Sequence, residues 1–162
     1  MVKVPFKRGI GGEKRDRKTM LMGSYQNSID AKNRVIIPAR FREELGPRCV
    51  LTRGLDECLI LYPMSTWAEQ QARLAALPRS DENARAFIRY VFANATECEI
   101  DRQGRLLIPA AYKDMARLDK ELVTLGMLDR VEIWSREVYD DSAYGGKLTP
   151  KDLQKFSETY KV

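Results

Sequence analysis

The sequence predicts an α+β fold, mainly β, built from two tandem units of similar structure. The stretch DAKNRVIIPA at residues 30–39 recurs as DRQGRLLIPA at 101–110, and Ile precedes both copies. The similarity continues downstream, because VLTRG at 50–54 matches LVTLG at 122–126. A repeat of this kind determines the architecture, since each copy is one supersecondary unit. Four short strands cannot close a core alone, so we expect the two units to pack together.

Each copy predicts a hairpin tip followed by a buried strand and a short helix. Asp30 and Asp101 open the turns, where an Asp side chain accepts hydrogen bonds from backbone N–H groups two residues on. Asn33 and Gly104 occupy matching positions, and both residue types tolerate a positive φ. The Arg four residues after each Asp can return to its carboxylate. Three branched apolar residues then predict the strand, and Pro opens the helix at a position where its missing N–H is not needed.

The helices outside the tips are predicted from their caps and their spacing. We expect helices over Ala39–Leu45, from a Ser65 or Thr66 cap to Leu77, and from a Ser80 cap onward. A polar helix opening at Thr149-Pro150 is expected near the end of the chain. The third helix carries apolar residues at helical spacing, which favours core packing over a subunit interface. This stripe consists of Ala84, Phe87, Ile88, Val91 and Phe92.

The charge distribution separates one end of the chain from the rest. The net charge is +5, and residues 1–19 alone hold seven Lys and Arg against two acids, so the remainder is neutral. This basic, unpatterned arm is expected to be disordered, and it is either a simple extension or a source of non-specific phosphate contacts. The expected division is arm 1–19, first unit 20–66, helical connector 67–94, second unit 95–138, and a polar tail with a helix, 139–162.

Several kinds of site are disfavoured by composition. The chain has no His, which excludes the usual zinc sites and His-based triads. Its three cysteines lack Cys-x-x-Cys spacing and are expected to be buried, reduced thiols in a cytosolic protein. Glu97, Glu99 and Asp101 share a strand face, for which a solvated or salt-bridging surface is favoured over a metal site. No nucleophile–base pair, Gly-rich phosphate loop or membrane-length apolar run is present. We therefore expect no catalytic residue, metal, cofactor or membrane partner.

Four motifs together resemble the bacterial MraZ regulators over residues 20–140. They are the two Asp-x-x-x-Arg hairpins, Tyr-Gln at 25–26, Thr-Arg-Gly-Leu-Asp at 52–56 and Val-Glu-Ile-Trp at 131–134. The resemblance implies two AbrB-like swapped-hairpin units forming a pseudo-two-fold, double-psi or β-barrel-like core with short flanking helices. One departure is Asn33, where Gly is usual in the family; Asn tolerates the same backbone region.

The resemblance also implies a function. It suggests a sequence-specific DNA-binding regulator, a repressor acting on tandem repeats upstream of its own division and cell-wall gene cluster. The regulator would work as a ring-like homo-oligomer in the cytoplasm, associated with the nucleoid. The alternative is an oligomeric scaffold that does not bind DNA, because a fold by itself does not establish a function.

Charge around the two tips suggests which residues would contact double-stranded DNA. Residues 24–42 hold four bases against one acid, whereas the equally long window 95–113 is neutral. This difference favours phosphate binding at the first hairpin, with an Arg reading guanine in the major groove. We therefore expect Arg34 to matter more than Arg105, which has three acids nearby in the sequence. The predicted DNA-binding residues are Lys32, Arg34, Arg40, Arg42 and Arg105, and the predicted turn-structural residues are Asp30, Asn33, Asp101 and Gly104.

Overall fold

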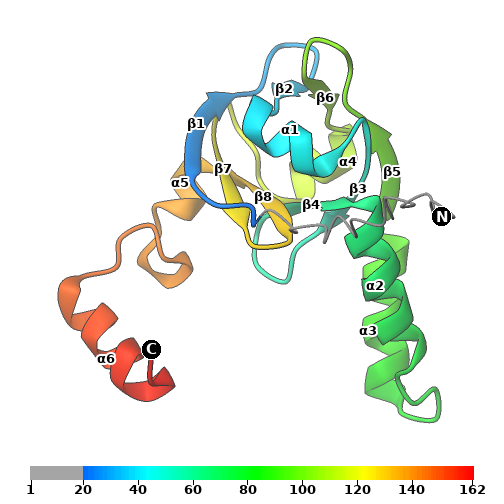
Figure 1. The fold of residues 1–162 in the computed structure, drawn as a ribbon, viewed down its shortest axis with the longest axis vertical. Coiled ribbons are helices and arrows are strands. Elements are labelled where there is room, and N and C mark those ends of the chain that lie inside the picture. The colour runs from blue at the N-terminus through cyan, green and yellow to red at the C-terminus, as the bar shows by residue number, and fades with distance from the viewer. Residues whose placement is uncertain (1–19) are drawn as a thin grey trace, which may run out of the picture.

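A computed structural model describes residues 20–162 as a sheet-rich core with helices around it (Figure 1). The predicted arm, residues 1–19, lies outside the described residues. The strands are β1 (Ser24–Ser28), β2 (Arg34–Ile36), β3 (Arg48–Arg53), β4 (Leu59–Pro63), β5 (Ala95–Glu99), β6 (Arg105–Leu107), β7 (Glu121–Met127) and β8 (Arg130–Ser135). The helices are α1 (Ala39–Leu45), α2 (Met64–Ala75), α3 (Glu82–Ala93), α4 (Ala110–Met115), α5 (Arg136–Tyr139), the 3-10 turn η1 (Ser142–Tyr144) and α6 (Pro150–Tyr160).

The two units exchange their first strands. The six-stranded antiparallel sheet has the order β1-β7-β8-β4-β3-β5, so β1 pairs with β7 of the second unit and β5 pairs with β3 of the first. The remaining strands of the two hairpins, β2 and β6, pair with each other, with Val35 opposite Leu106. This exchange confirms the predicted fold class, α+β and mainly sheet, with two swapped-hairpin units in a β-barrel-like core and short flanking helices.

The core lies where the exchanged segments meet. Val35, Ile37 and Phe41 of the first unit and Leu106 and Ile108 of the second are fully buried. Burying one such side chain stabilises the fold by about 1.5–3 kcal/mol, because its apolar surface leaves water. Both units supply this core, so the stability of each depends on the other.

The ends of two helices differ from the prediction. Pro63 precedes α2 with φ −54°, so the helix begins at Met64 directly after β4, and Ser65 and Thr66 lie in its first turn instead of capping it. A proline with this φ is pre-organised for a helix start, which makes a polar cap unnecessary here. Helix α3 is capped by Asp81 and not by Ser80, since the Asp81 carboxylate accepts hydrogen bonds from the next-turn backbone N–H groups.

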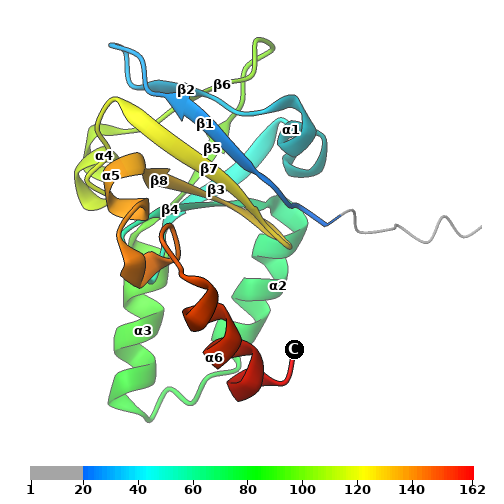
Figure 2. The ribbon, with the colours of Figure 1, turned by 90° about the vertical axis from the view of Figure 1, so that its left-hand side faces the viewer.

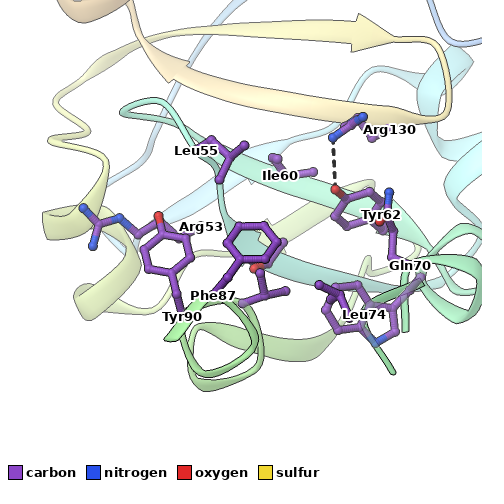
Figure 3. Close-up of a pocket in the computed structure, with 12 residues that line it drawn as sticks. Arg53, Leu55, Ile60, Tyr62, Gln70, Leu74, Phe87, Tyr90 and Arg130 are labelled. Carbon is purple, nitrogen blue, oxygen red and sulfur yellow. Dashed lines mark hydrogen bonds between the residues drawn. The ribbon is translucent and has the colours of Figure 1, made fainter. Parts of the chain in front are cut away.

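The apolar stripe of α3 is only partly covered, so the prediction of core packing holds in part. Val91 packs against a buried apolar cluster that includes Trp67, and Ala84 and Ile88 are half-buried. No residue of α3 is buried, and Phe87 and Phe92 are 41% and 40% exposed. Helices α2 and α3 extend away from the sheet (Figure 2), so little of α3 can pack against the strands. The stripe instead helps to line a cavity of about 150 Å³ between α2, α3 and the sheet. Figure 3 shows Phe87 and Tyr90 on one side of this cavity and Leu74 on the other.

The C-terminal helix α6 begins as predicted. The Thr149 side chain accepts a hydrogen bond from the Asp152 backbone N–H, and the Asp152 carboxylate accepts one from the Thr149 backbone N–H. Pro150 occupies the first helical position. Across residues 20–162, no helix combines the length and the apolar character that a membrane span requires.

Candidate nucleic-acid interface

The first hairpin tip is organised by one carboxylate. Oδ1 of Asp30 accepts hydrogen bonds from the backbone N–H groups of Lys32 and Arg34, each at 2.9 Å. Oδ2 of Asp30 accepts a third from the side-chain Nε of Arg34 at 2.8 Å. Asn33 completes the turn with φ 59°. The side chain of Arg34 is thereby held to the turn through Nε.

The second tip repeats this arrangement. Asp101 accepts hydrogen bonds from the backbone N–H groups of Gln103 and Arg105 at 2.9 Å and from Nε of Arg105 at 2.8 Å. Gly104 takes the left-handed position with φ 79°. The side chains of Arg34 and Arg105 are similarly exposed, at 30% and 33%. The two tips therefore present their arginines in the same way.

The carboxylates of both tips favour their charged form. Hydrogen bonds from the backbone N–H of Arg34 and from its side chain hold the pKa of Asp30 below its usual 3.8. The backbone N–H and the side chain of Arg105 lower the pKa of Asp101 in the same way. Arg34 and Arg105 each bond to their Asp through Nε. Among the described residues, neither of these two arginines has a hydrogen bond from a terminal nitrogen. Those terminal nitrogens remain available for a base edge or a phosphate.

Each tip is also contacted by the helix that follows the other tip. A Cβ on Gly104 would lie 2.7 Å from Cζ of Arg42, so the guanidinium of α1 lies against the second tip. Nζ of Lys113, on α4, donates to Oδ1 of Asn33 at 3.4 Å in the first tip. The backbone repeats this crossing, because Ile37 N–H donates to the Gly104 carbonyl at 2.8 Å. Arg42 and Lys113 therefore each follow one tip in the sequence but contact the other tip in space.

This exchange removes the predicted difference in charge between the tips. Three basic side chains lie at each tip: Lys32, Arg34 and Lys113 at the first, and Arg42, Arg102 and Arg105 at the second. Glu43 of α1 lines the same surface hollow as Arg42, Asp101 and Arg102. Glu97, expected to compete for Arg105, instead pairs with Arg48 at 2.6 Å. The charge comparison along the chain therefore does not describe the surroundings of the tips in space, and the greater importance of Arg34 over Arg105 stays a prediction that loses this support.

The other predicted basic residues occupy different environments. Arg40 is exposed on α1, and no described contact joins it to a tip. Arg42 is half-buried, and its Nε is buried without a hydrogen-bond partner among the described residues. Lys113 and Arg102 were missed as candidates. The match between Arg42 and Lys113 in the repeat, combined with the expected hairpin swap, was the signal that could have identified Lys113.

Both tips extend from the same end of the molecule. The loops before β2 and β6 lie together at one end of the core in both views, opposite α2 and α3 (Figures 1 and 2). The β2–β6 pairing fixes this arrangement. One surface therefore gathers six basic side chains, on the two tips of matching geometry and on the helices α1 and α4 that contact them. Such a surface is suited to an anionic, extended partner.

Comparison with known proteins identifies the family. A family model described as "MraZ protein, putative antitoxin-like" matches residues 20–90 and 91–145. The chain belongs to the MraZ family. Relatives named "Transcriptional regulator MraZ" include those of Moorella thermoacetica, 56% identical over 122 residues (75% of this chain, 85% of the relative), and Caldanaerobacter subterraneus, 43% identical over 143 residues (88% and 100%). These relatives are named as transcriptional regulators, which agrees with the regulatory class that the resemblance implied.

Proposed function

We propose that this MraZ-family chain is a sequence-specific DNA-binding repressor that reads tandem repeats upstream of its own gene, in the division and cell-wall gene cluster. The observation that carries the proposal is the single surface holding two hairpin tips, each with three basic side chains. Double-stranded DNA is the partner, and the cytoplasm, at the nucleoid, is the site of action. No catalytic step is involved.

In this proposal Arg34 and Arg105 read bases. Their Nε groups are bound to Asp30 and Asp101, and this restricts the side chains before DNA arrives. Less conformational entropy is then lost on binding. The terminal nitrogens match the O6 and N7 acceptors of guanine in the major groove, which is wide enough for a two-stranded ribbon.

The remaining basic residues bind phosphates. Lys32 is exposed at the first tip, and Arg40 is exposed on α1. Arg42, behind the second tip, has an Nε that lacks a partner among the described residues. Phosphate contacts fix the position and register of the protein on the duplex, whereas base contacts provide the sequence information.

We further propose that the protein acts as a ring-like homo-oligomer. The two units, residues 20–66 and 95–138, would present the tips, and the connector, residues 67–94, would contact a neighbouring subunit. The exposed apolar side chains of Phe87 and Phe92 support this role for α3, and the sheet edges β1 and β5 are open to further pairing. Several subunits on tandem repeats would add avidity. Sedimentation that finds only a species of 18.6 kDa at micromolar concentration would contradict this assembly.

A fluorescence anisotropy titration tests DNA recognition. The probes are the DNA upstream of the protein's own gene, the same DNA with one repeat, and a shuffled sequence of equal length and composition. We expect tight binding to the tandem repeats, weaker binding to one repeat and salt-sensitive residual binding to the shuffled DNA. Equal affinity for all three would refute sequence-specific recognition, and an oligomer that binds none of them would favour the scaffold function.

A further inference from the structure

Two cysteines that are far apart in the sequence face each other on neighbouring strands. Cys49 of β3 and Cys98 of β5 are directly opposite in the antiparallel register, and their Sγ atoms lie 3.3 Å apart. Both are free thiols; Cys49 is fully buried and Cys98 is half-buried. The spacing along the chain gives no sign of this pair, which the hairpin exchange creates by placing β5 beside β3.

We propose that Cys49 and Cys98 form an oxidation site that closes reversibly to an intramolecular disulfide joining the two units. Residues directly opposite on antiparallel strands have Cα atoms about 4.5–5.5 Å apart, which is within the range that a disulfide spans. The sulfurs already touch, so rotation of the side chains is enough to form the bond. The strand β5 is at the edge of the sheet, and Cys98 is the less buried of the two residues.

The electrostatics of the pair assign different roles to the two sulfurs. The hydrogen bond with Cys98 lowers the pKa of the Cys49 thiol, whereas that same interaction, together with burial, raises the pKa of Cys98. These directions favour ionisation of Cys49 over Cys98, and the Cys98 thiol also donates to the Cys49 carbonyl at 3.5 Å. The thiolate is the reactive form of cysteine. Opening of the edge strand β5 gives an oxidant access to Cys49.

The oxidant is a hydroperoxide, for which the reaction balances. The thiolate attacks one peroxide oxygen, the O–O bond breaks, and the departing hydroxide takes a proton, leaving a sulfenic acid on Cys49. The Cys98 sulfur then attacks the sulfenic sulfur, so that the S–S bond forms, the S–O bond breaks and water leaves with the thiol proton. Overall, two thiols lose two electrons and two protons, and hydrogen peroxide becomes two waters.

The third cysteine provides an internal control. Cys58 is buried in a separate apolar cluster, and its Sγ donates to the Glu132 carboxylate at 3.8 Å. Burial raises the pKa of this thiol, and the nearby carboxylate of Glu132 raises it further. It therefore lacks both the thiolate and the neighbouring sulfur that the reaction needs.

The test counts thiols in the full chain. The reduced protein is treated with hydrogen peroxide, quenched, denatured and alkylated, and then analysed by intact mass and peptide mapping. We expect loss of two of the three alkylation sites, a Cys49–Cys98 linkage, and recovery of all three sites on treatment with dithiothreitol. The Cys58→Ala variant should still form the linkage, whereas Cys98→Ala should form no intramolecular disulfide and should carry the oxidation on Cys49 as a sulfenic acid that dithiothreitol reverses.

The peptide map of the unaltered chain decides the outcome even if a variant does not fold. Three alkylatable thiols after a peroxide dose that oxidises dithiothreitol would overturn the proposal. So would a linkage that includes Cys58, a disulfide between two chains, or conversion of Cys98 to a sulfinic acid. The oxidised chain should also melt at a higher temperature than the reduced one, because the crosslink restricts the unfolded chain.

Discussion

Replacing the arginine of either tip should weaken specific DNA binding to a similar degree. The two arginines have the same Nε–carboxylate distance of 2.8 Å and side-chain exposures of 30% and 33%. Each tip also holds three basic side chains. Because the arginines are held in the same way at both tips, comparable losses are expected for Arg34→Ala and Arg105→Ala.

The size of the loss follows from one base contact per arginine. A bidentate pair with guanine contributes about 1–3 kcal/mol, which corresponds to about a 5- to 150-fold change in affinity. Removing both arginines should multiply the two losses, because the tips would contact separate bases. Folding should change little, since exposed ion pairs contribute little to stability, and we expect the melting temperature to fall by no more than about 4 °C.

The assay is anisotropy on the tandem-repeat DNA, with size-exclusion profiles of every variant. Arg34→Lys keeps the charge but loses the planar fork, so it should lose specificity while retaining salt-dependent binding to shuffled DNA. Arg117→Ala is the matched control, because its guanidinium also forms an exposed ion pair at 2.8 Å, but with Glu57 in the β3–β4 turn. Its affinity should match that of the unaltered chain.

The outcome that refutes equivalent tips is a large difference between the two alanine variants. A loss above tenfold for one and none for the other, with both assembled normally, would show that only one tip reaches the bases. An equal loss for Arg117→Ala would show that the effect is one of general charge and not of the tips.

Three further predictions concern salt, packing and acid. If the four basic side chains of the tips other than Arg34 and Arg105 contact phosphate, affinity should fall by about 150-fold between 50 and 200 mM salt, and a salt-independent titration would contradict these contacts. Phe41→Ala should lower the free energy of unfolding by about 3–5 kcal/mol in urea denaturation, because Phe41 is fully buried against Tyr25. A similar loss for Phe87→Ala, at a half-exposed position, would contradict the assignment of the core to Phe41 and its neighbours. The pKa values of Asp30 and Asp101 are lowered, so their contribution to stability is present above pH 3.8 and is lost as the pH falls through their folded pKa values. The difference in unfolding free energy between the unaltered chain and the Asp30→Asn, Asp101→Asn double variant should therefore shrink in acid. A difference that stays constant with pH would be inconsistent with these pKa shifts.

Features set by neighbouring residues were predictable from the sequence. The helix at Ala39–Leu45 has the expected bounds, and Thr149 and Pro150 start α6 as expected. The positive φ of Asn33 and Gly104 follows from turn chemistry, in which few residue types tolerate that backbone region. In each case the relevant interactions lie within four residues along the chain.

Features set by distant residues were not predictable from the residues alone. Periodicity marked the apolar face of α3, but it could not say whether another element of the chain covers Phe87 and Phe92. The charge comparison grouped Arg42 with the first tip because they are close in the sequence. The strand exchange places Arg42 at the second tip, and only the pairing of β5 with β3 and of β1 with β7 reveals it.

Joining both units in a single polypeptide has a consequence for symmetry. Two identical chains that exchanged hairpins would be forced to present identical tips, whereas the tips of one chain can diverge by independent mutation. Divergence is already visible, with Asn33 contacted by Lys113 at one tip and Gly104 contacted by Arg42 at the other. The surface consequently has a direction, so a non-palindromic site could be bound in one orientation only.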